Sequence, residues 1–242
     1  MPGIDLFPGI MLALAFAALA AVMLRAIDPI GAVFGCLTAF LIFLGGGFPA
    51  IILLGLFFLV GSLATIWNMQ KKISSGLAQE NKGRRSVSNV LGNGGVAAVL
   101  GLLAWRFPEH SVLLQYMIAA SLASATSDTL SSEMGNVYGS RFYKIPGLGP
   151  GRRGEDGAAS PEGTAFGLIG SAGIALAYGF TAGWNRAVAW IAIAGFLGNL
   201  TDSILGGSLQ KGGYLNNHGV NFLSTLAAAL FAGGMALLAG VL

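Results

Sequence analysis

Two acidic residues, Asp128 and Asp202, stand in polar clusters at the ends of long apolar segments. Asp128 belongs to the stretch Ser-Asp-Thr-Leu-Ser-Ser-Glu, which closes with Glu133, and Asp202 belongs to Asn-Leu-Thr-Asp-Ser. An ionised carboxylate close to lipid is costly and is retained mainly where it meets a cation, a metal ion or water. These three carboxylates are therefore the first candidates for chemistry in this chain.

Two basic loops rich in glycine supply the opposite charge. One reads Lys82-Gly83-Arg84-Arg85-Ser86, and the other runs over residues 146–157 and contains Arg152 and Arg153. Glycine lets a backbone approach an anion closely, and the guanidinium fork fits phosphate oxygens. Acids beside such loops suit phosphate groups bridged by a divalent cation such as Mg²⁺, which takes oxygen ligands. The sequence holds no Cys/His cluster, so we expect no zinc site.

Asparagines recur at helical spacing near the same acids. Asn89 and Asn93 are four residues apart, as are Asn217 and Asn221. Residues at this spacing share one face of a helix, so each pair predicts a short polar stripe. These stripes could contact a ligand, or they could form hydrogen bonds between helices.

Asp128 and Glu133 are five residues apart, so on an ideal helix their side chains diverge by about 140°. They can share one ligand only if the helix ends or bends between them. Gly135 follows directly, and we expect the helix to end near residue 130.

Composition assigns the class. The chain of 242 residues is 55% hydrophobic and 10% charged, whereas a soluble domain carries roughly a quarter charged residues. The sequence therefore predicts an all-α polytopic integral membrane protein, because membrane helices satisfy their own backbone groups. The single cysteine, Cys36, lies inside an apolar segment and cannot form an internal disulfide.

Segments of about 20 apolar residues are candidate membrane spans. They predict about eight transmembrane helices in a single transmembrane domain, with N-terminal helices over 1–70 and a motif-bearing catalytic region over 80–242. The candidate spans are 7–24, 29–45, 48–67, 88–105, 111–130, 163–182, 187–205 and 219–241.

Lys and Arg are distributed unevenly over the alternate loops of this topology. Only Arg106 and Arg186 fall on one side; the remaining 11 of the 13 fall on the other, and Lys/Arg excess marks the cytoplasmic side. We therefore expect both termini outside and the three longest loops in the cytoplasm. That orientation gathers the polar clusters at the cytoplasmic face. The 11 residues are Arg25, Lys71, Lys72, Lys82, Arg84, Arg85, Arg141, Lys144, Arg152, Arg153 and Lys211.

Four segments carry a family resemblance: SDTLSSEMG (127–135), GEDGAASPEGTAFGLIGS (154–171), GNLTDSILGGSLQKGG (198–213) and NNHGVNFLST (216–225). They resemble a widespread integral-membrane family, long described as of unknown function, that includes the plant chloroplast phytyl-phosphate kinase. The resemblance implies a membrane kinase of isoprenoid metabolism, as in tocopherol biosynthesis. It would move a phosphoryl group from a nucleoside triphosphate, CTP by analogy, to a prenyl monophosphate such as phytyl or geranylgeranyl phosphate.

By the resemblance, Asp128, Glu133 and Asp202 fall in the family's acidic motifs, and Asn217 and Asn221 in its polar C-terminal motif. Together with the residue patterns above, this suggests a role for each candidate residue. Asp128 and Asp202 would hold Mg²⁺ on the nucleotide phosphates. Glu133 would be a third ligand, or would contact the groups that bind the metal. The remaining candidates would bind substrate or nucleotide, the basic ones at phosphates and the asparagines at the acceptor head group: Lys82, Arg84, Arg85, Asn89, Asn93, Arg152, Arg153, Glu162, Lys211, Asn217 and Asn221.

Other readings of these features remain open. The basic residues could serve only membrane orientation, and Glu162, after Ser160 and Pro161, suits the first turn of a helix. A membrane transporter for a cation or a phosphorylated metabolite would also retain intramembrane acids. A nucleotidyltransferase that forms CDP-lipids would use the same acids and metal. We expect no nucleic-acid partner.

Overall fold

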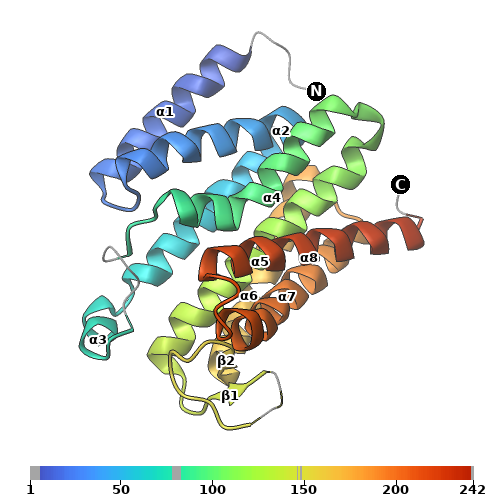
Figure 1. The fold of residues 1–242 in the computed structure, drawn as a ribbon. Helices are drawn as coiled ribbons and strands as arrows, with labels where there is room; N and C mark the ends of the chain where they lie inside the picture. Colours follow the sequence, from blue (N-terminus) through green and yellow to red (C-terminus); the bar gives the residue numbers. More distant parts are fainter. Residues whose placement is uncertain (1–5, 78–82, 146, 148, 241–242) are drawn as a thin grey trace.

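The computed structural model describes residues 6–77, 83–145, 147 and 149–240 of the chain. It is an all-α bundle with one short hairpin (Figure 1). The helices are α1 (Phe7–Met23), α2 (Pro29–Ile66), α3 (Met69–Ser74), α4 (Val87–Arg106), α5 (Ser111–Tyr138), α6 (Pro161–Ala182), α7 (Ala187–Leu205) and α8 (Asn217–Leu238), with short turns η3 (Pro108–His110) and η4 (Gly206–Gln210) and strands β1 (Tyr143–Lys144) and β2 (Ala158–Ala159).

The chain spans a membrane by composition and helix length. Within the described residues, five helices are long and apolar enough to cross a bilayer, namely α2, α4, α6, α7 continued by η4, and α8. α1 is apolar but shorter. The expectation of an all-α polytopic membrane protein is confirmed, while the number of crossings is approximate.

Helix α2 contains a break where the sequence predicts a boundary between two spans. Gly47 has φ 61° and ψ −156°, a conformation that only glycine adopts readily, and Pro49 follows inside the helix. Figure 1 shows the chain turning back at this point, so that the two halves of α2 run in different directions. The separate segments 29–45 and 48–67 predicted from sequence correspond to these halves.

Helix α5 is the centre of the bundle and packs against α2, α4, α6, α7 and α8. Its middle turns, including Ile118, Leu122 and Ala123, are fully buried. Small residues permit this close packing; a Cβ added at Gly195 of α7 would lie 2.6 Å from the Cβ of Ala123. α5 continues to Tyr138, so the expected helix end near residue 130 is wrong. Gly135 is instead a contact point for α6, where Ser160 Oγ would lie 3.3 Å from an added Cβ.

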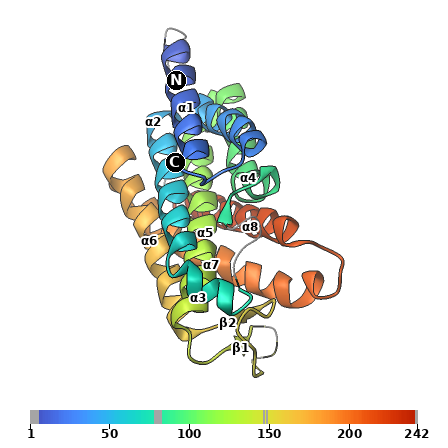
Figure 2. The same ribbon diagram turned by 90° about the vertical axis from the view of Figure 1, so that its left-hand side faces the viewer.

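The helix starts follow recognisable capping signals. Asp28 accepts a hydrogen bond from Gly31 N ahead of α2, Ser160 accepts from Gly163 N ahead of α6, and Asn216 accepts from Gly219 N ahead of α8. α4 begins with a capping box formed by Ser86 and Asn89. Such caps satisfy amide groups that a helix leaves unpaired at its N-terminus. Figure 2 shows α3, the hairpin β1–β2 and the last turns of α5 at one end of the molecule.

Candidate functional site

A polar cavity of about 760 Å³ opens at this end of the bundle, between α4, α5, α7, α8 and the hairpin. The sequence predicted that the polar ends of these helices meet at one site, and nine of the predicted residues line this cavity. They are Arg84, Arg85, Asn89, Asn93, Asp128, Glu133, Asp202, Asn217 and Asn221.

Asp128 of α5 and Asp202 of α7 both line the cavity. Their carboxyl groups lie within hydrogen-bonding reach of each other. Ser224 Oγ donates to Asp202 Oδ2 over 3.2 Å. The Asn221 amide, oriented to suit its neighbours, donates to the same oxygen over 3.1 Å and accepts from Asn93 Nδ2 over 3.3 Å. Residues from α4, α5, α7 and α8 therefore converge in one network.

Two adjacent carboxylates repel each other unless a proton or a cation lies between them. Asp128 and Asp202 are both partly buried, which strengthens that repulsion. Their oxygens, with the amide oxygens of nearby asparagines, are the ligand type that Mg²⁺ prefers. The pair therefore fits a divalent cation. Within the described part of the chain, no three His, Cys, Asp or Glu side chains gather into a metal-holding group.

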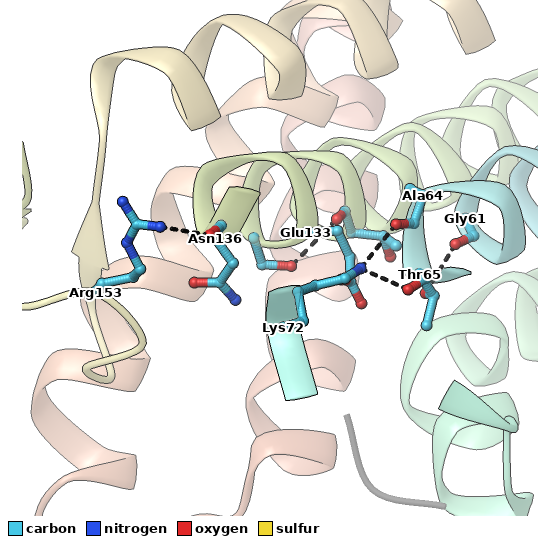
Figure 3. A network of polar contacts seen from close by, with 9 residues as sticks. Gly61, Ala64, Thr65, Lys72, Glu133, Asn136 and Arg153 are labelled. Carbon is cyan, nitrogen blue, oxygen red and sulfur yellow. Dashed lines mark hydrogen bonds and ion pairs between the residues drawn. The ribbon is translucent and has the colours of Figure 1, made fainter. Parts of the chain in front are cut away.

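Glu133, which also lines the cavity, is engaged in a buried ion pair with α3. Lys72 Nζ lies 2.6 Å from Glu133 Oε2, and the two side chains are 1% and 3% exposed (Figure 3). Lys72 also donates to the carbonyl oxygens of Ala64 and Thr65, at the C-terminal end of α2, where a cation is favoured. Glu133 Oε1 has no hydrogen-bond partner among the described residues. Its role as a metal ligand stays a prediction.

Arg85 forms part of the cavity wall beside α2. Its guanidinium carbon lies 4.6 Å from the ring centroid of Phe57 and 5.7 Å from that of Phe58. Burial lowers the pKa of Arg85 to about 10, and the nearby Glu133 carboxylate opposes that shift. Arg85 therefore stays protonated at neutral pH, and an anionic group in the cavity would meet a poorly hydrated positive charge.

The hairpin reaches the cavity through a close approach of two glycine segments. Gly157 has φ 74°, and a Cβ there would overlap Gly207 directly after α7. This contact brings Asp156 near Asp202. Glu155 Oε1 forms ion pairs with Lys144 Nζ at 3.2 Å and with Lys211 Nζ at 3.3 Å. The pair with Lys211 joins the hairpin to the segment before α8.

The other predicted residues lie outside the cavity wall. Arg153 donates to the carbonyl oxygens of Asn136 and Gly139 and so anchors the hairpin to the end of α5 (Figure 3). Glu162 accepts a 2.6 Å hydrogen bond from Ser140 Oγ. Arg152 borders a surface hollow beside Lys144, and Lys211 pairs with Glu155. Lys82 lies outside the described residues.

Some residues of the site were not among the predicted set. Asp156, Asn199 and His218 line the cavity, and His218 Nδ1 is buried without a partner among the described residues. Asn199 precedes Asp202 by three residues, a helical spacing that was available from sequence. Lys72 gave no such signal, because it is one of several lysines in a basic loop.

These features define a class: an all-α membrane protein with an acidic–basic polar cavity at one end of its bundle. The chain belongs to the integral membrane protein family DUF92, whose model matches residues 11–229. The family resemblance inferred from the motifs is confirmed. No solved structure matches the chain.

Three relatives illustrate the range of the family. An uncharacterized membrane protein of Synechocystis sp. is 35% identical over 74% of this chain and 70% of its own length. An uncharacterized membrane protein of Methanocaldococcus jannaschii is 32% identical over 85% and 84%. Protein VTE6, chloroplastic, of Arabidopsis thaliana is 33% identical over 77% of this chain and 58% of its own length.

Proposed function

We propose that this protein is a membrane kinase that transfers a phosphoryl group from a nucleoside triphosphate to a prenyl monophosphate, such as phytyl or geranylgeranyl phosphate. The observation that carries the proposal is the Asp128–Asp202 pair, which lines the same cavity as Arg84 and Arg85 at the end of a membrane bundle. Similarity to the plant phytyl-phosphate kinase of the family supports the choice of reaction. CTP as the donor is our proposal by analogy with the family.

In the proposed reaction an oxygen of the acceptor phosphate attacks the γ-phosphorus of the nucleotide. The bond from that phosphorus to the β–γ bridging oxygen breaks, and the nucleoside diphosphate leaves with the electron pair. The acceptor phosphate supplies the attacking oxygen, so no protein nucleophile is needed. No general base is needed either, because a phosphate monoester is already largely ionised at neutral pH. Catalysis then rests on positioning and on charge stabilisation.

Each group of side chains has a part in this proposal. Asp128 and Asp202 would hold Mg²⁺, which when bound would neutralise charge on the nucleotide phosphates. Arg84 and Arg85 would bind phosphate oxygens and stabilise the charge of the transferred group. Asn93 and Asn221 hold each other and Asp202 in place, which would fix the direction of the carboxylate.

Location supports a lipid acceptor. The cavity lies at one end of the apolar bundle, so an amphiphile can keep its tail in the bilayer while its head group enters the polar site. The Lys/Arg asymmetry of the loops supports a cytoplasmic position for this end, where nucleoside triphosphates are available.

The test supplies purified protein in detergent with Mg²⁺, geranylgeranyl phosphate and CTP labelled in either the α or the γ phosphate. We expect label in the lipid only from the γ position. Label from the α position would instead identify a CDP-lipid nucleotidyltransferase, and ion flux in liposomes without lipid labelling would identify a transporter.

Asn substitutions test the residues. Asp128→Asn and Asp202→Asn should each lower γ-phosphoryl transfer by about 10²–10³-fold, the usual cost of losing one electrostatic contact to the transition state. Asp28→Asn is the matched control, because Asp28 only caps α2 and asparagine caps a helix equally well. Full activity in both site variants would overturn the metal-site assignment.

A further inference from the structure

A second, apolar groove of about 250 Å³ lies between α1, α2 and α4. Small residues such as Ala18 of α1 and Gly35 and Gly55 of α2 form much of its wall, and Phe58 closes one side. A Cβ placed at Gly55 would meet no atom within 4 Å, so the space beside it is open.

The groove and the polar cavity share two residues, Arg85 and Asn89. The guanidinium of Arg85 lies over Phe57 and Phe58 of the groove, and Arg85 also lines the polar cavity. The two spaces therefore meet at a cationic side chain. A ligand that fits both has an anionic head and a hydrocarbon tail.

The size of the groove limits the tail. Small-molecule pockets usually enclose roughly 300–1,000 Å³, and this groove is below that range. It has room for one chain near its head group and too little for the paired chains of a phospholipid. α1, which forms one wall, contributes no buried residue to the core, so the groove borders the bilayer.

We propose that this groove holds the head-proximal part of a prenyl chain, while Arg85 at the junction binds the phosphate of the same molecule. The proposal rests on the kinase function above, since it names the seat of that enzyme's acceptor. It assigns recognition of the prenyl chain to α1 and the two halves of α2, which lie outside the motif-bearing region 80–242.

A leucine at Gly55 would extend into the open space, because its Cβ meets no atom within 4 Å. Gly55→Leu should weaken labelling by geranylgeranyl phosphate carrying a diazirine on its first isoprene unit by about tenfold, equivalent to displacing roughly two methylene groups. Gly234→Leu is the matched control, because Gly234 is an exposed helical glycine of α8 that also has nothing within 4 Å. Ala18→Leu approaches the groove from α1 and repeats the test if Gly55→Leu fails to fold.

The labelled peptides locate the chain. In the unmodified protein we expect cross-links in α1, α2 and α4, and loss of them in Gly55→Leu but not in Gly234→Leu. Equal labelling of these helices by a diazirine phosphatidic acid would show that the groove takes ordinary membrane lipid and would overturn the proposal. Cross-links confined to α6–α8 would do the same.

A kinetic arm separates this proposal from the kinase function. Gly55→Leu should raise KM for geranylgeranyl phosphate and leave KM for CTP unchanged. If Gly55→Leu and Gly234→Leu have the same KM for geranylgeranyl phosphate, the groove proposal is refuted while the kinase function stands. Groove labelling in a protein that transfers no phosphoryl group would refute the kinase while the groove stands.

Discussion

Lys72 and Glu133 carry opposite charges in a place where neither reaches water, with side chains 1% and 3% exposed. A buried charge is tolerable when it is paired and hydrogen-bonded, and Lys72 meets both conditions through Glu133 and two carbonyl oxygens of α2. The pair connects α3 and the end of α2 to the central helix α5.

Removing one partner should be far more harmful than removing both. Lys72→Met is expected to destabilise the protein by about 3–5 kcal/mol, because it leaves an uncompensated buried carboxylate. Lys72→Met combined with Glu133→Gln should recover much of that loss. Thermal unfolding in detergent measures both. Lys71→Met is the control, since within the described residues the Lys71 side chain makes one hydrogen bond, to Val137 O. Equal destabilisation of the single and double variants would contradict this account.

At the scale of elements, the hairpin β1–β2 depends on one close backbone contact. Gly157 and Gly147 both have positive φ, at 74° and 91°, but only Gly157 lies against another segment. An alanine at either position is strained by roughly 1–3 kcal/mol. Gly157→Ala must in addition move the hairpin away from Gly207.

We therefore expect Gly157→Ala to lower phosphoryl transfer much more than Gly147→Ala, in which the same kind of backbone strain displaces no neighbouring segment. The physical reason is that Asp156 and the hairpin retreat from the cavity. Steady-state kinetics beside a melting curve for each variant checks this. Identical activities would show that the hairpin contact has no part in the site.

The ion pairs of Glu155 make the stability of the hairpin depend on pH. Hydrogen bonding to Lys144, with smaller contributions from Arg152 N and Lys211, lowers the pKa of Glu155 below its ordinary value of 4.5. A group with a lowered folded-state pKa stabilises the fold above its unfolded pKa, and that contribution is lost as the pH falls through the folded value.

Amides of residues 149–159 should therefore exchange faster, after correction for intrinsic rates, when the pH falls below about 4.5. Glu155→Gln should show the fast exchange already at neutral pH. Glu109→Gln, beside η3, serves as the control. An unchanged exchange profile in Glu155→Gln would contradict the stabilisation of the hairpin by the ion pairs of Glu155.

At the scale of the whole molecule, the loop charges predict which end faces the cytoplasm. After Cys36→Ala, single cysteines at Trp184 and Tyr214 report on opposite ends, and both positions are exposed in the structure. An impermeant maleimide should label position 184 in intact cells and position 214 only after lysis. The reverse pattern would place the polar cavity outside and remove the case for a cytoplasmic nucleotide donor.

Much of this architecture was predictable from sequence because the signals are local. Apolar length marks the helices, and Gly47 with Pro49 marks the break in α2. The meeting of Asp128 with Asp202 followed from topology, since both lie toward the same end of the bundle. Contacts formed between distant segments were not predictable: the Lys72–Glu133 pair joins residues 61 positions apart, and Arg153 binds backbone carbonyls instead of the cavity.

The turn at Gly47 has a consequence for how the protein is made. The two halves of α2 are joined with no polar loop between them. No connecting segment can therefore stay in water while the second half is synthesised. We expect the insertion machinery to release residues 29–66 into the bilayer together, as one helical hairpin. Both halves of α2 would then enter the bilayer in a single event, before the acidic residues of α5 and α7 leave the ribosome.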